Sequence, residues 1–382
     1  MMARKLTAIQ GGWEAANLAV DSSWTYRLSP TDIVDLEKAL TFALRANKSL
    51  FAMTPTDFPL SEALSSVLAQ TMRTLQTGTG VYLLKGVPVN RWSTEQLRIL
   101  FWGLGMHLGV ARPQGKTSLY LTDVRDVGTD YRSSTGRGYN SNAALDFHTD
   151  TGDIVGLMCL RTAASGGESA IVSAVRVHNV MLKKHPSALK HLYEPMHFSR
   201  QGDAALDEKP YYQSSVFGQA DGHFAAFVRP SHHILNAQKD FQELPRLSSD
   251  QKQALEVLHN TIQDERLCFR MYLESGDIQF MNNYTVIHAR TNYIDHAEPE
   301  LKRHLMRLWL AVPQGQPLPS LWQDAMKDIS PCAVRGGVRG CNITPEAIAY
   351  ERRLAQHHGM RYSRISSDLS VYEGALAAAI AP

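Results

Sequence analysis

The stretch GDIQFMNNYTVIH, residues 276–288, decides the fold of this chain. A turn at its start feeds an apolar strand, and the run ends by delivering His288. Similar short β-type runs, each bounded by turn residues, recur from about residue 119 to residue 309, at 154–160, 169–175, 224–228 and 304–312. The pattern predicts an antiparallel sandwich or barrel.

Helical signals precede this β-rich region. Ser29, Pro30 and Asp32 form a helix start, because Ser caps, Pro fits the first turn and an acid faces the positive helix end. We expect that helix to reach about Ala46. Two more helices are expected, one over about 60–76 and one from the capping box at Ser93 to about Gly109, with a buried strand over 80–86 between them.

Shorter helical segments are expected inside and after the β-rich region. They lie near 174–185, 249–265 and 344–357. Between the last two, the Gly/Arg-rich run 335–340 lacks the Gly-Lys-Ser/Thr ending of a phosphate-binding loop, so we interpret it as a mobile loop or lid.

These elements fit one large domain with an added tail. We place the main domain at 1–320, with a helical part over about 1–118 and a β core over about 119–315, followed by a loop and helix extension at 321–382.

Composition limits the classes of protein. Hydrophobic residues make up 44% and charged residues 20% of the chain, as in a globular protein, and no run suits a membrane span. The net charge of +2 makes nucleic acid and anionic membranes unlikely partners. The four cysteines form no CxxC pair, and no signal peptide precedes them, so we expect a reduced, cytoplasmic location.

The segment 145–150 carries the first chemical signal. His148 and Asp150 stand at positions i and i+2, which lie on the same face of an extended chain and can chelate one ion. Taken alone, this His-x-Asp pattern is equally explained by a histidine at the end of a strand followed by a capping aspartate. With His288 it makes two histidines and one carboxylate, the set that holds iron(II) in non-haem oxygenases.

A second signal follows His288. Arg303 and Arg307 lie four positions apart on the apolar strand-like run 303–310, roughly 13 Å apart and on one face. Arginines that face a β core are costly unless each meets an anion. We therefore expect both to line a cavity that receives carboxylates.

The residues and their order resemble the taurine dioxygenase and 2,4-dichlorophenoxyacetate dioxygenase family, within the clavaminate synthase-like superfamily. The motif consists of His-x-Asp, a distal His preceded by Asn, and an Arg-x-x-x-Arg strand. It covers roughly residues 80–312. A longer turn at 296–300 and the tail after Pro317 depart from the family pattern and indicate a divergent branch.

The resemblance implies a double-stranded β-helix, or jelly roll, flanked by N-terminal and C-terminal helices in an α+β protein. It implies Fe(II) as the metal, 2-oxoglutarate as cosubstrate, O2 as oxidant, and hydroxylation or desaturation of a small organic molecule, with release of succinate and CO2.

Matching positions imply the site residues. His148, Asp150 and His288 are the catalytic iron ligands. Arg303, helped by Ser169, holds the distal carboxylate of 2-oxoglutarate. Arg307 and Asn283 contact substrate.

Tyr139 is also expected to contact substrate, from the polar, Gly-rich stretch 122–142, which suits a loop that orders over the pocket.

Several alternatives are open. The chain could be a jelly-roll metalloprotein that does not use 2-oxoglutarate, such as an isomerase or a cofactor-independent dioxygenase, or a non-catalytic binding module. Arg290 shares the face of His288 and could bind cosubstrate, although a structural pairing with Asp295 is favoured. His304 is expected to be exposed, and the adjacent pair His232 and His233 is a weak candidate ligand pair. The substrate, the position oxidised, the role of the tail and the oligomeric state do not follow from the sequence.

Overall fold

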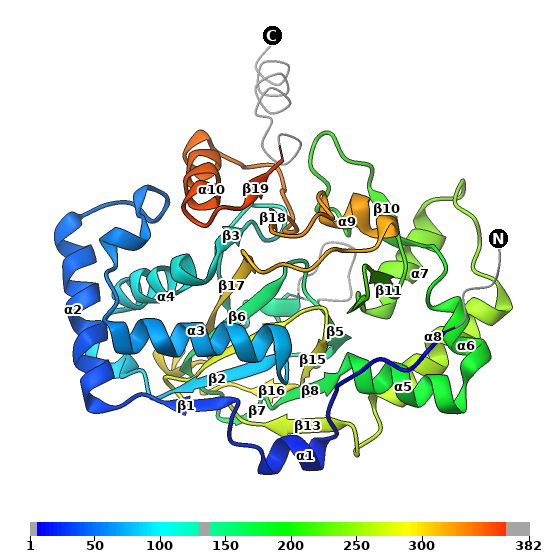
Figure 1. The fold of residues 1–382 in the computed structure, drawn as a ribbon, viewed down its shortest axis with the longest axis horizontal. Coiled ribbons are helices and arrows are strands. Elements are labelled where there is room, and N and C mark those ends of the chain that lie inside the picture. The colour runs from blue at the N-terminus through cyan, green and yellow to red at the C-terminus, as the bar shows by residue number, and fades with distance from the viewer. Residues whose placement is uncertain (1–5, 130–137, 364–382) are drawn as a thin grey trace, which may run out of the picture.

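Two facing β-sheets form the centre of the computed structural model, which describes residues 6–129 and 138–363 (Figure 1). The larger sheet has the strand order β1-β2-β14-β6-β17-β3, with β4 also paired to β17, and the smaller has the order β13-β8-β15-β5. The strands of the larger sheet are β1 (Thr25–Arg27), β2 (Val81–Lys85), β3 (Val110–Arg112), β4 (Leu121–Val124), β6 (Ile154–Arg161), β14 (Ile278–Asn282) and β17 (His304–Ala311). Those of the smaller are β5 (Leu145–His148), β8 (Ser169–Ser173), β13 (Cys268–Met271) and β15 (Val286–Arg290).

The two sheets enclose a shared interior. Alternate residues of each strand face it, because side chains in a strand point to opposite faces in turn. Val155 of β6, Ile171 of β8 and Trp309 of β17 belong to one buried apolar cluster that spans both sheets. The jelly roll with flanking helices is therefore confirmed. The larger sheet also takes strands from the part of the chain before residue 119.

Three helices cover the outer face of the larger sheet (Figure 1). They are α2 (Pro30–Ala46), α3 (Glu62–Thr77) and α4 (Thr94–Leu108), and α2 and α4 start at the predicted cap residues Ser29 and Ser93. The apolar faces of α3 and α4 meet the outward residues of the sheet, as where Phe101 lies against Phe280, and α2 packs on these two helices. Each large side chain buried in this way stabilises the fold by roughly 2 kcal/mol.

A second helical layer covers the smaller sheet. Its helices are α5 (Ala174–Lys184), α6 (Pro186–His191), α7 (Ser231–Asp240), α8 (Ser249–Ile262) and α9 (Gln323–Met326). Two hairpins lie among them, β9 (Met196–Ser199) with β10 (Tyr211–Ser214) and β11 (Phe217–Ala220) with β12 (His223–Ala226). Trp322, which is fully buried in this layer, ties the C-terminal region to the helices.

Short elements complete the described chain. They are α1 (Ala15–Val20), β7 (Ser165–Gly166), β16 (Tyr293–Ile294), β18 (Ala333–Val334), α10 (Pro345–His357), β19 (Arg361–Tyr362) and six 3-10 turns, η1 (Leu50–Ala52), η2 (Pro55–Asp57), η3 (Val89–Arg91), η4 (Gly138–Asn140), η5 (Pro299–Leu301) and η6 (Ser320–Trp322). No helix in this part of the chain is both long and apolar enough to cross a membrane.

The interpretation of the run 335–340 as a mobile lid is wrong. Arg335 is fully buried and Arg339 is 4% exposed, because each guanidinium meets a carboxylate from another part of the fold. The stretch 122–142, expected as one loop over the pocket, begins within β4 and contains η4. Its central part, 130–137, lies outside the described residues.

Candidate metal centre

The three candidate ligands come together at one end of the space between the sheets. His148 is the last residue of β5, and His288 lies directly opposite it on β15, as its cross-strand partner. Asp150 lies in the turn just after β5. The strand pairing therefore sets the two histidines side by side, and the turn brings the carboxylate back toward them.

The distances suit a single ion. The Nε2 atom of His148 lies 3.9 Å from Oδ1 of Asp150, and Nε2 of His288 lies 3.6 Å from Oδ2. One potential ligand atom from each residue falls within 4.8 Å of the others, the one such group of three among residues 6–129 and 138–363. The Asp150 Oδ2 atom is buried without a hydrogen-bond partner. The donor set and this unsatisfied oxygen fit a divalent cation.

The electrostatics keep His148 and Asp150 in the protonation states that bind metal. Burial, followed by the neighbouring His288, lowers the pKa of His148 to about 3, so its ring is neutral. Burial alone would raise the pKa of Asp150, but the Arg307 guanidinium and both imidazoles outweigh it and hold that pKa well below its usual range. The Nδ1 atom of His148 lies 2.8 Å from the carbonyl oxygen of Asp146, which leaves Nε2 for the metal.

Asn283, expected to contact substrate, is engaged by the backbone of the metal turn. Its side-chain oxygen accepts from the Asp150 N–H at 3.1 Å, and its side-chain nitrogen donates to the Gly152 carbonyl at 3.1 Å. The residue is 1% exposed. Both ends of the amide thus hold the turn that carries Asp150, which makes Asn283 a positioning residue.

Arg307 and Tyr139 lie at the metal end. The Nη1 atom of Arg307 is 3.6 Å from Oδ1 of Asp150, and its Nε donates to the side chain of Gln114 at 2.7 Å. The guanidinium stacks over the rings of Tyr139 and Trp309, with centroids 5.1 and 4.7 Å away. Both predicted residues therefore face the metal, whereas Gln114 gave no signal in the sequence.

Arg303 occupies a different position on the same barrel interior. It is 6% exposed, its Nη1 is buried without a hydrogen-bond partner, and its guanidinium stacks on Tyr293 at 4.9 Å. Burial lowers the pKa of Arg303. An unsatisfied buried guanidinium fits a carboxylate guest such as the distal end of 2-oxoglutarate.

Ser169 lies on β8, with its hydroxyl 3.4 Å from the side-chain oxygen of Gln279. Gln279 is fully buried on β14. Sequence reasoning missed Gln279 as a buried polar group beside Ser169, since it lies inside a run that reads as an ordinary apolar strand.

Two further predictions, the pairing of Arg290 with Asp295 and the exposure of His304, were wrong. Arg290 donates through Nη2 to the carbonyls of Ser141 and Ala143, while the Asp295 carboxylate accepts from the backbone N–H of Arg303 at 2.7 Å. Arg290 thus ties the chain before β5 to β15. His304 is 3% exposed, not solvent-facing, because β4 covers that edge of β17 and its Asp123 lies 2.7 Å from the imidazole.

The cavity at the metal has a volume of about 120 Å³. Besides His148, Asp150, Arg307 and Tyr139, its wall includes Gln201, Asp203, Arg229, His232 and His233. The His232–His233 pair thus lines the cavity next to the ligand set. Arg229 was missed, and only its place directly after the strand at 224–228 could have drawn notice.

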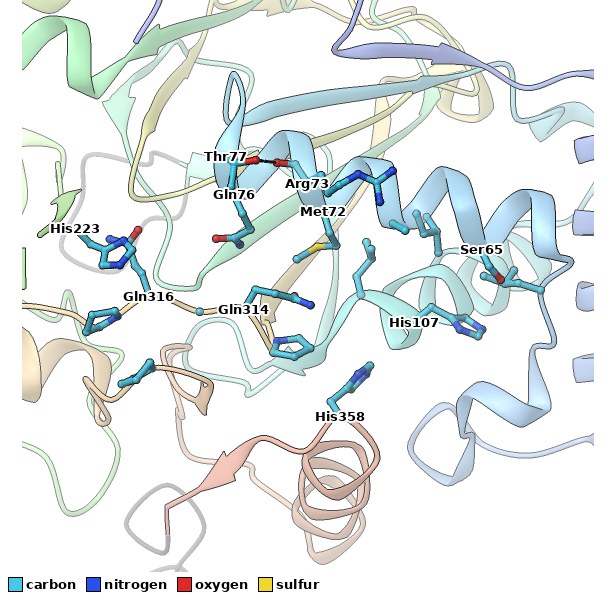
Figure 2. A pocket seen from close by; sticks show the side chains of 18 residues that line it. Ser65, Met72, Arg73, Gln76, Thr77, His107, His223, Gln314, Gln316 and His358 are labelled. Carbon is cyan, nitrogen blue, oxygen red and sulfur yellow. Dashed lines mark hydrogen bonds between the residues drawn. The ribbon is translucent and has the colours of Figure 1, made fainter. Parts of the chain in front are cut away.

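A larger cavity than the one at the metal lies elsewhere in the described structure. It measures about 820 Å³ and lies between α3 and the segment 313–317 (Figure 2). Figure 2 shows His107, His223 and His358 spread around it, with Met72 and Gln76 reaching in from α3. It shares no lining residue with the metal cavity, so size does not identify the active site.

A buried triad of two histidines and one carboxylate at the end of a jelly roll defines a mononuclear non-haem metal enzyme. The model of the family described as "Taurine catabolism dioxygenase TauD, TfdA family" matches residues 41–309, well over half of the chain. The chain belongs to this family. With the triad in place, it is an iron(II)- and 2-oxoglutarate-dependent dioxygenase.

Two curated relatives are similar over most of their length. FR-33289 synthase of Streptomyces rubellomurinus (strain ATCC 31215) is 28% identical over 313 residues, which cover 81% of this chain and 91% of that protein. The taurine hydroxylase-like protein SAT17 of Stachybotrys chartarum (strain CBS 109288 / IBT 7711) is 26% identical over 311 residues, 78% of this chain and 77% of that protein. Identities this low fit a divergent branch.

Solved structures agree on the fold. An asparagine oxygenase in complex with Fe(II), 3-hydroxyasparagine and succinate has a TM-score of 0.57 and 16% identity, over 75% of this chain and 93% of that one. The non-haem iron oxygenase OrfP in complex with Fe and alpha-ketoglutaric acid has a TM-score of 0.56 and 16% identity, over 75% and 94%.

Proposed function

We propose that the chain oxidises a small anionic molecule, with the acidic group of the substrate held by Arg307. One observation carries this proposal, namely that the Arg307 guanidinium reaches the metal cavity and lies 3.6 Å from the carboxylate of Asp150. A guanidinium there can offer further N–H groups to a substrate carboxylate, sulfonate or similar anion while the rings of Tyr139 and Trp309 fix its plane.

The iron ligands in this proposal are His148, Asp150 and His288, and Arg303 with Ser169 takes the distal carboxylate of 2-oxoglutarate. Bound iron(II), with 2-oxoglutarate and O2, supplies the oxidising power and releases succinate and CO2. The protein contributes orientation. Arg303, just before β17, and Arg307, within it, would hold two different anions at separate positions, which prevents cosubstrate and substrate from exchanging places.

Hydroxylation or desaturation is the expected outcome. Asp150 occupies the carboxylate position of the ligand set, so no ligand position is left open for a halide. The small cavity, about 120 Å³ at the metal, favours a compact substrate and excludes a nucleic acid strand from the reacting position. The four cysteines are all free, in keeping with the reduced, cytoplasmic location that we propose.

The test is O2 consumption and succinate release by the purified protein with Fe(II) and 2-oxoglutarate, measured across a panel of small carboxylates, sulfonates and phosphonates with neutral analogues as matched controls. Stimulation by anionic members alone supports the proposal. Turnover that is indifferent to 2-oxoglutarate would favour an isomerase or cofactor-independent dioxygenase. Stimulation by neutral analogues equal to that by acids would remove the proposed role of Arg307.

A further inference from the structure

A C-terminal segment outside the residues matched by the family model contacts the turn that carries the ligand Asp150. Arg335 is fully buried, and its Nε donates to Oδ1 of Asp153 at 2.7 Å. Its Nη1 donates to the Ser330 carbonyl at 2.9 Å. Asp153 is 2% exposed, so this is an ion pair without access to water.

Asp153 ends the same turn that carries Asp150. Its carboxylate also accepts from the Tyr284 hydroxyl at 2.6 Å and from the Val312 N–H at 2.9 Å. Its backbone carbonyl accepts from the N–H of Asn283, the residue whose amide holds Asp150 and Gly152. The position of Asp153 is thus transmitted to Asp150 through the turn itself and through Asn283.

The segment also contacts this turn through its backbone. The Gly337 N–H donates to the Thr151 carbonyl at 2.6 Å. Gly336 has a φ of +69°, and a Cβ at that position would lie 2.9 Å from the Thr151 oxygen, so a side chain there would push the two apart. Arg112 of β3 holds the Gly336 carbonyl from the other side at 3.2 Å.

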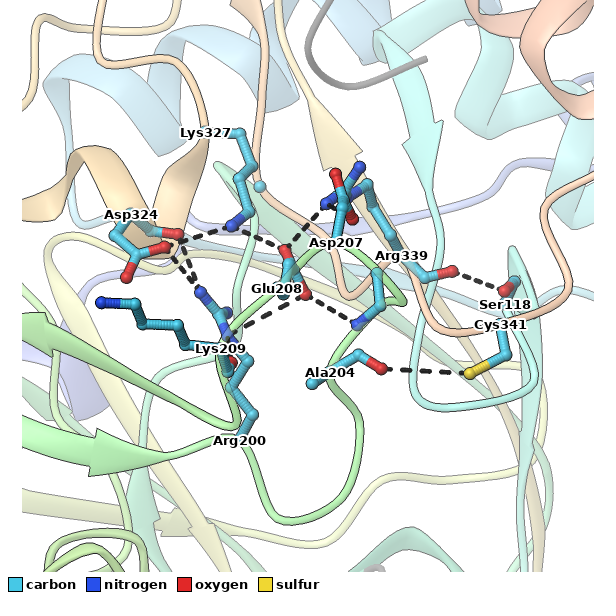
Figure 3. A network of polar contacts seen from close by, with 12 residues as sticks. Ser118, Arg200, Ala204, Asp207, Glu208, Lys209, Asp324, Lys327, Arg339 and Cys341 are labelled. Carbon is cyan, nitrogen blue, oxygen red and sulfur yellow. Dashed lines mark hydrogen bonds and ion pairs between the residues drawn. The ribbon is translucent and has the colours of Figure 1, made fainter. Parts of the chain in front are cut away.

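Both flanks of Arg335 are anchored independently of the turn. Figure 3 shows Glu208 between Lys327 on one side and Arg339 on the other, with Nζ of Lys327 at 2.6 Å and Nη2 of Arg339 at 3.3 Å. Ser118 holds the Arg339 carbonyl in the same view. The segment that carries Arg335 is therefore held on both sides, at Lys327 and at Arg339, by contacts that do not involve Asp153.

A buried ion pair is weak evidence for stability, because desolvation offsets most of its Coulomb energy, but it fixes a geometry. We propose that Arg335 is a positioning residue for the metal centre, and that it acts through Asp153 by fixing the turn that carries Asp150. The inference rests on the ligand set of the proposed function. It gives the segment after residue 309 a part in metal binding.

The experiment measures cobalt(II) affinity of the full-length protein without 2-oxoglutarate, by absorption titration. Arg335→Met alone would leave the buried Asp153 carboxylate without its counter-charge. The test therefore uses the double variant Arg335→Gln with Asp153→Asn, and the conservative variant Arg335→Lys. Loss of an outer partner of a metal ligand typically weakens metal binding about ten- to hundredfold. We expect a loss in that range for the double variant and a smaller one for Arg335→Lys.

A matched control is the ion pair of Lys85 with Asp277, a carboxylate that is 1% exposed and lies 2.9 Å from the Lys85 Nζ. Lys85→Met with Asp277→Asn removes a comparable pair that touches no residue of the metal turn. Its cobalt affinity should stay within about twofold of the parent, whatever its thermal stability.

The outcomes separate the two proposals. If the parent binds cobalt and His288→Ala does not, the ligand set stands, and an unchanged affinity in the Arg335 double variant overturns the positioning role alone. Equal losses in the double variant and the Lys85 control would also overturn it, since they would reflect general destabilisation. A parent protein that binds no cobalt overturns the ligand set, and the positioning role with it.

Discussion

An arginine lies at each end of the barrel interior, and the surroundings of the two guanidiniums differ. At the metal end, Arg307 lies beside a carboxylate, bonds to Gln114 and stacks on two aromatic rings. At the other end, Arg303 is more deeply buried, stacks on Tyr293 and keeps an unsatisfied Nη1. A buried cation without its anion is unfavourable, which supports the proposed binding of a carboxylate at Arg303, whereas Arg307 already lies beside the carboxylate of Asp150.

The largest effect should come from breaking the metal end itself. His148→Ala or Asp150→Ala removes one of three protein ligands, and we expect Fe(II)-dependent turnover to be abolished while the fold is retained, because the core clusters are untouched. Succinate release and circular dichroism measure the two. Full activity in either variant would remove the metal hypothesis.

The next effect separates the arginines. Arg303→Ala should raise the 2-oxoglutarate concentration needed for half-maximal turnover by roughly ten- to a hundredfold, since a charge-assisted contact to a carboxylate is worth about 1.5–3 kcal/mol. Arg303→Lys, which keeps the charge but loses the bidentate geometry, should fall between. An unchanged requirement would point to Arg290 or Arg307 as the cosubstrate anchor.

A smaller and more selective effect is expected for Arg307→Leu. Oxidation of an anionic substrate should fall about tenfold or more, while the uncoupled decarboxylation of 2-oxoglutarate continues near its parent rate. Carbon dioxide release with and without substrate distinguishes the two. Equal losses of both reactions would show that Arg307 serves the cosubstrate or the fold.

The smallest effect concerns the wall of the metal cavity, where Gln201 and Asp203 belong to the loop that Glu208 anchors. Burial opposes ionisation of Glu208, but Arg200 and Lys327 prevail and lower its pKa from 4.5 to about 2. Because the folded pKa is depressed, the stabilisation is complete above about pH 4.5 and disappears as the pH falls toward 2.

Glu208→Gln should therefore lower the melting temperature at pH 7 by a few degrees and flatten its decline between pH 4.5 and 2. Thermal melts across that range provide the measurement. A variant whose acid profile parallels that of the parent would contradict the assigned pKa.

The sequence predicted local structure well where short-range rules act. The helix Pro30–Ala46 begins and ends where its cap residues indicate, because capping depends on neighbours within one turn. The triad was also predictable, since its residues form a motif. The environments of charged residues were not. His304 was expected to be exposed and Arg335 to belong to a mobile loop or lid, but each is buried against an acid distant in the sequence, Asp123 and Asp153.

The same limit applies to residues that support the site. Asn283 was noticed by its place in the motif, but its engagement with the turn follows from contacts that no local pattern encodes. Gln114, Gln279 and Arg229 lie in segments that read as ordinary strand or loop, and only tertiary packing brings them beside Arg307, Ser169 and the metal cavity, respectively.

The place of β5 in the sheet gives the metal a mechanical role. Among the described residues, β5 is the outermost strand of the smaller sheet and pairs with β15 alone. β5 carries His148 and β15 carries His288, so one bound ion would tie the edge strand to its neighbour. Without the metal, that edge would be held by a bulged ladder and by the contacts of Arg290 and Asn283 on either side of β5. The apoprotein should then exchange the β5 amide hydrogens ahead of those of β8, which is paired on both sides.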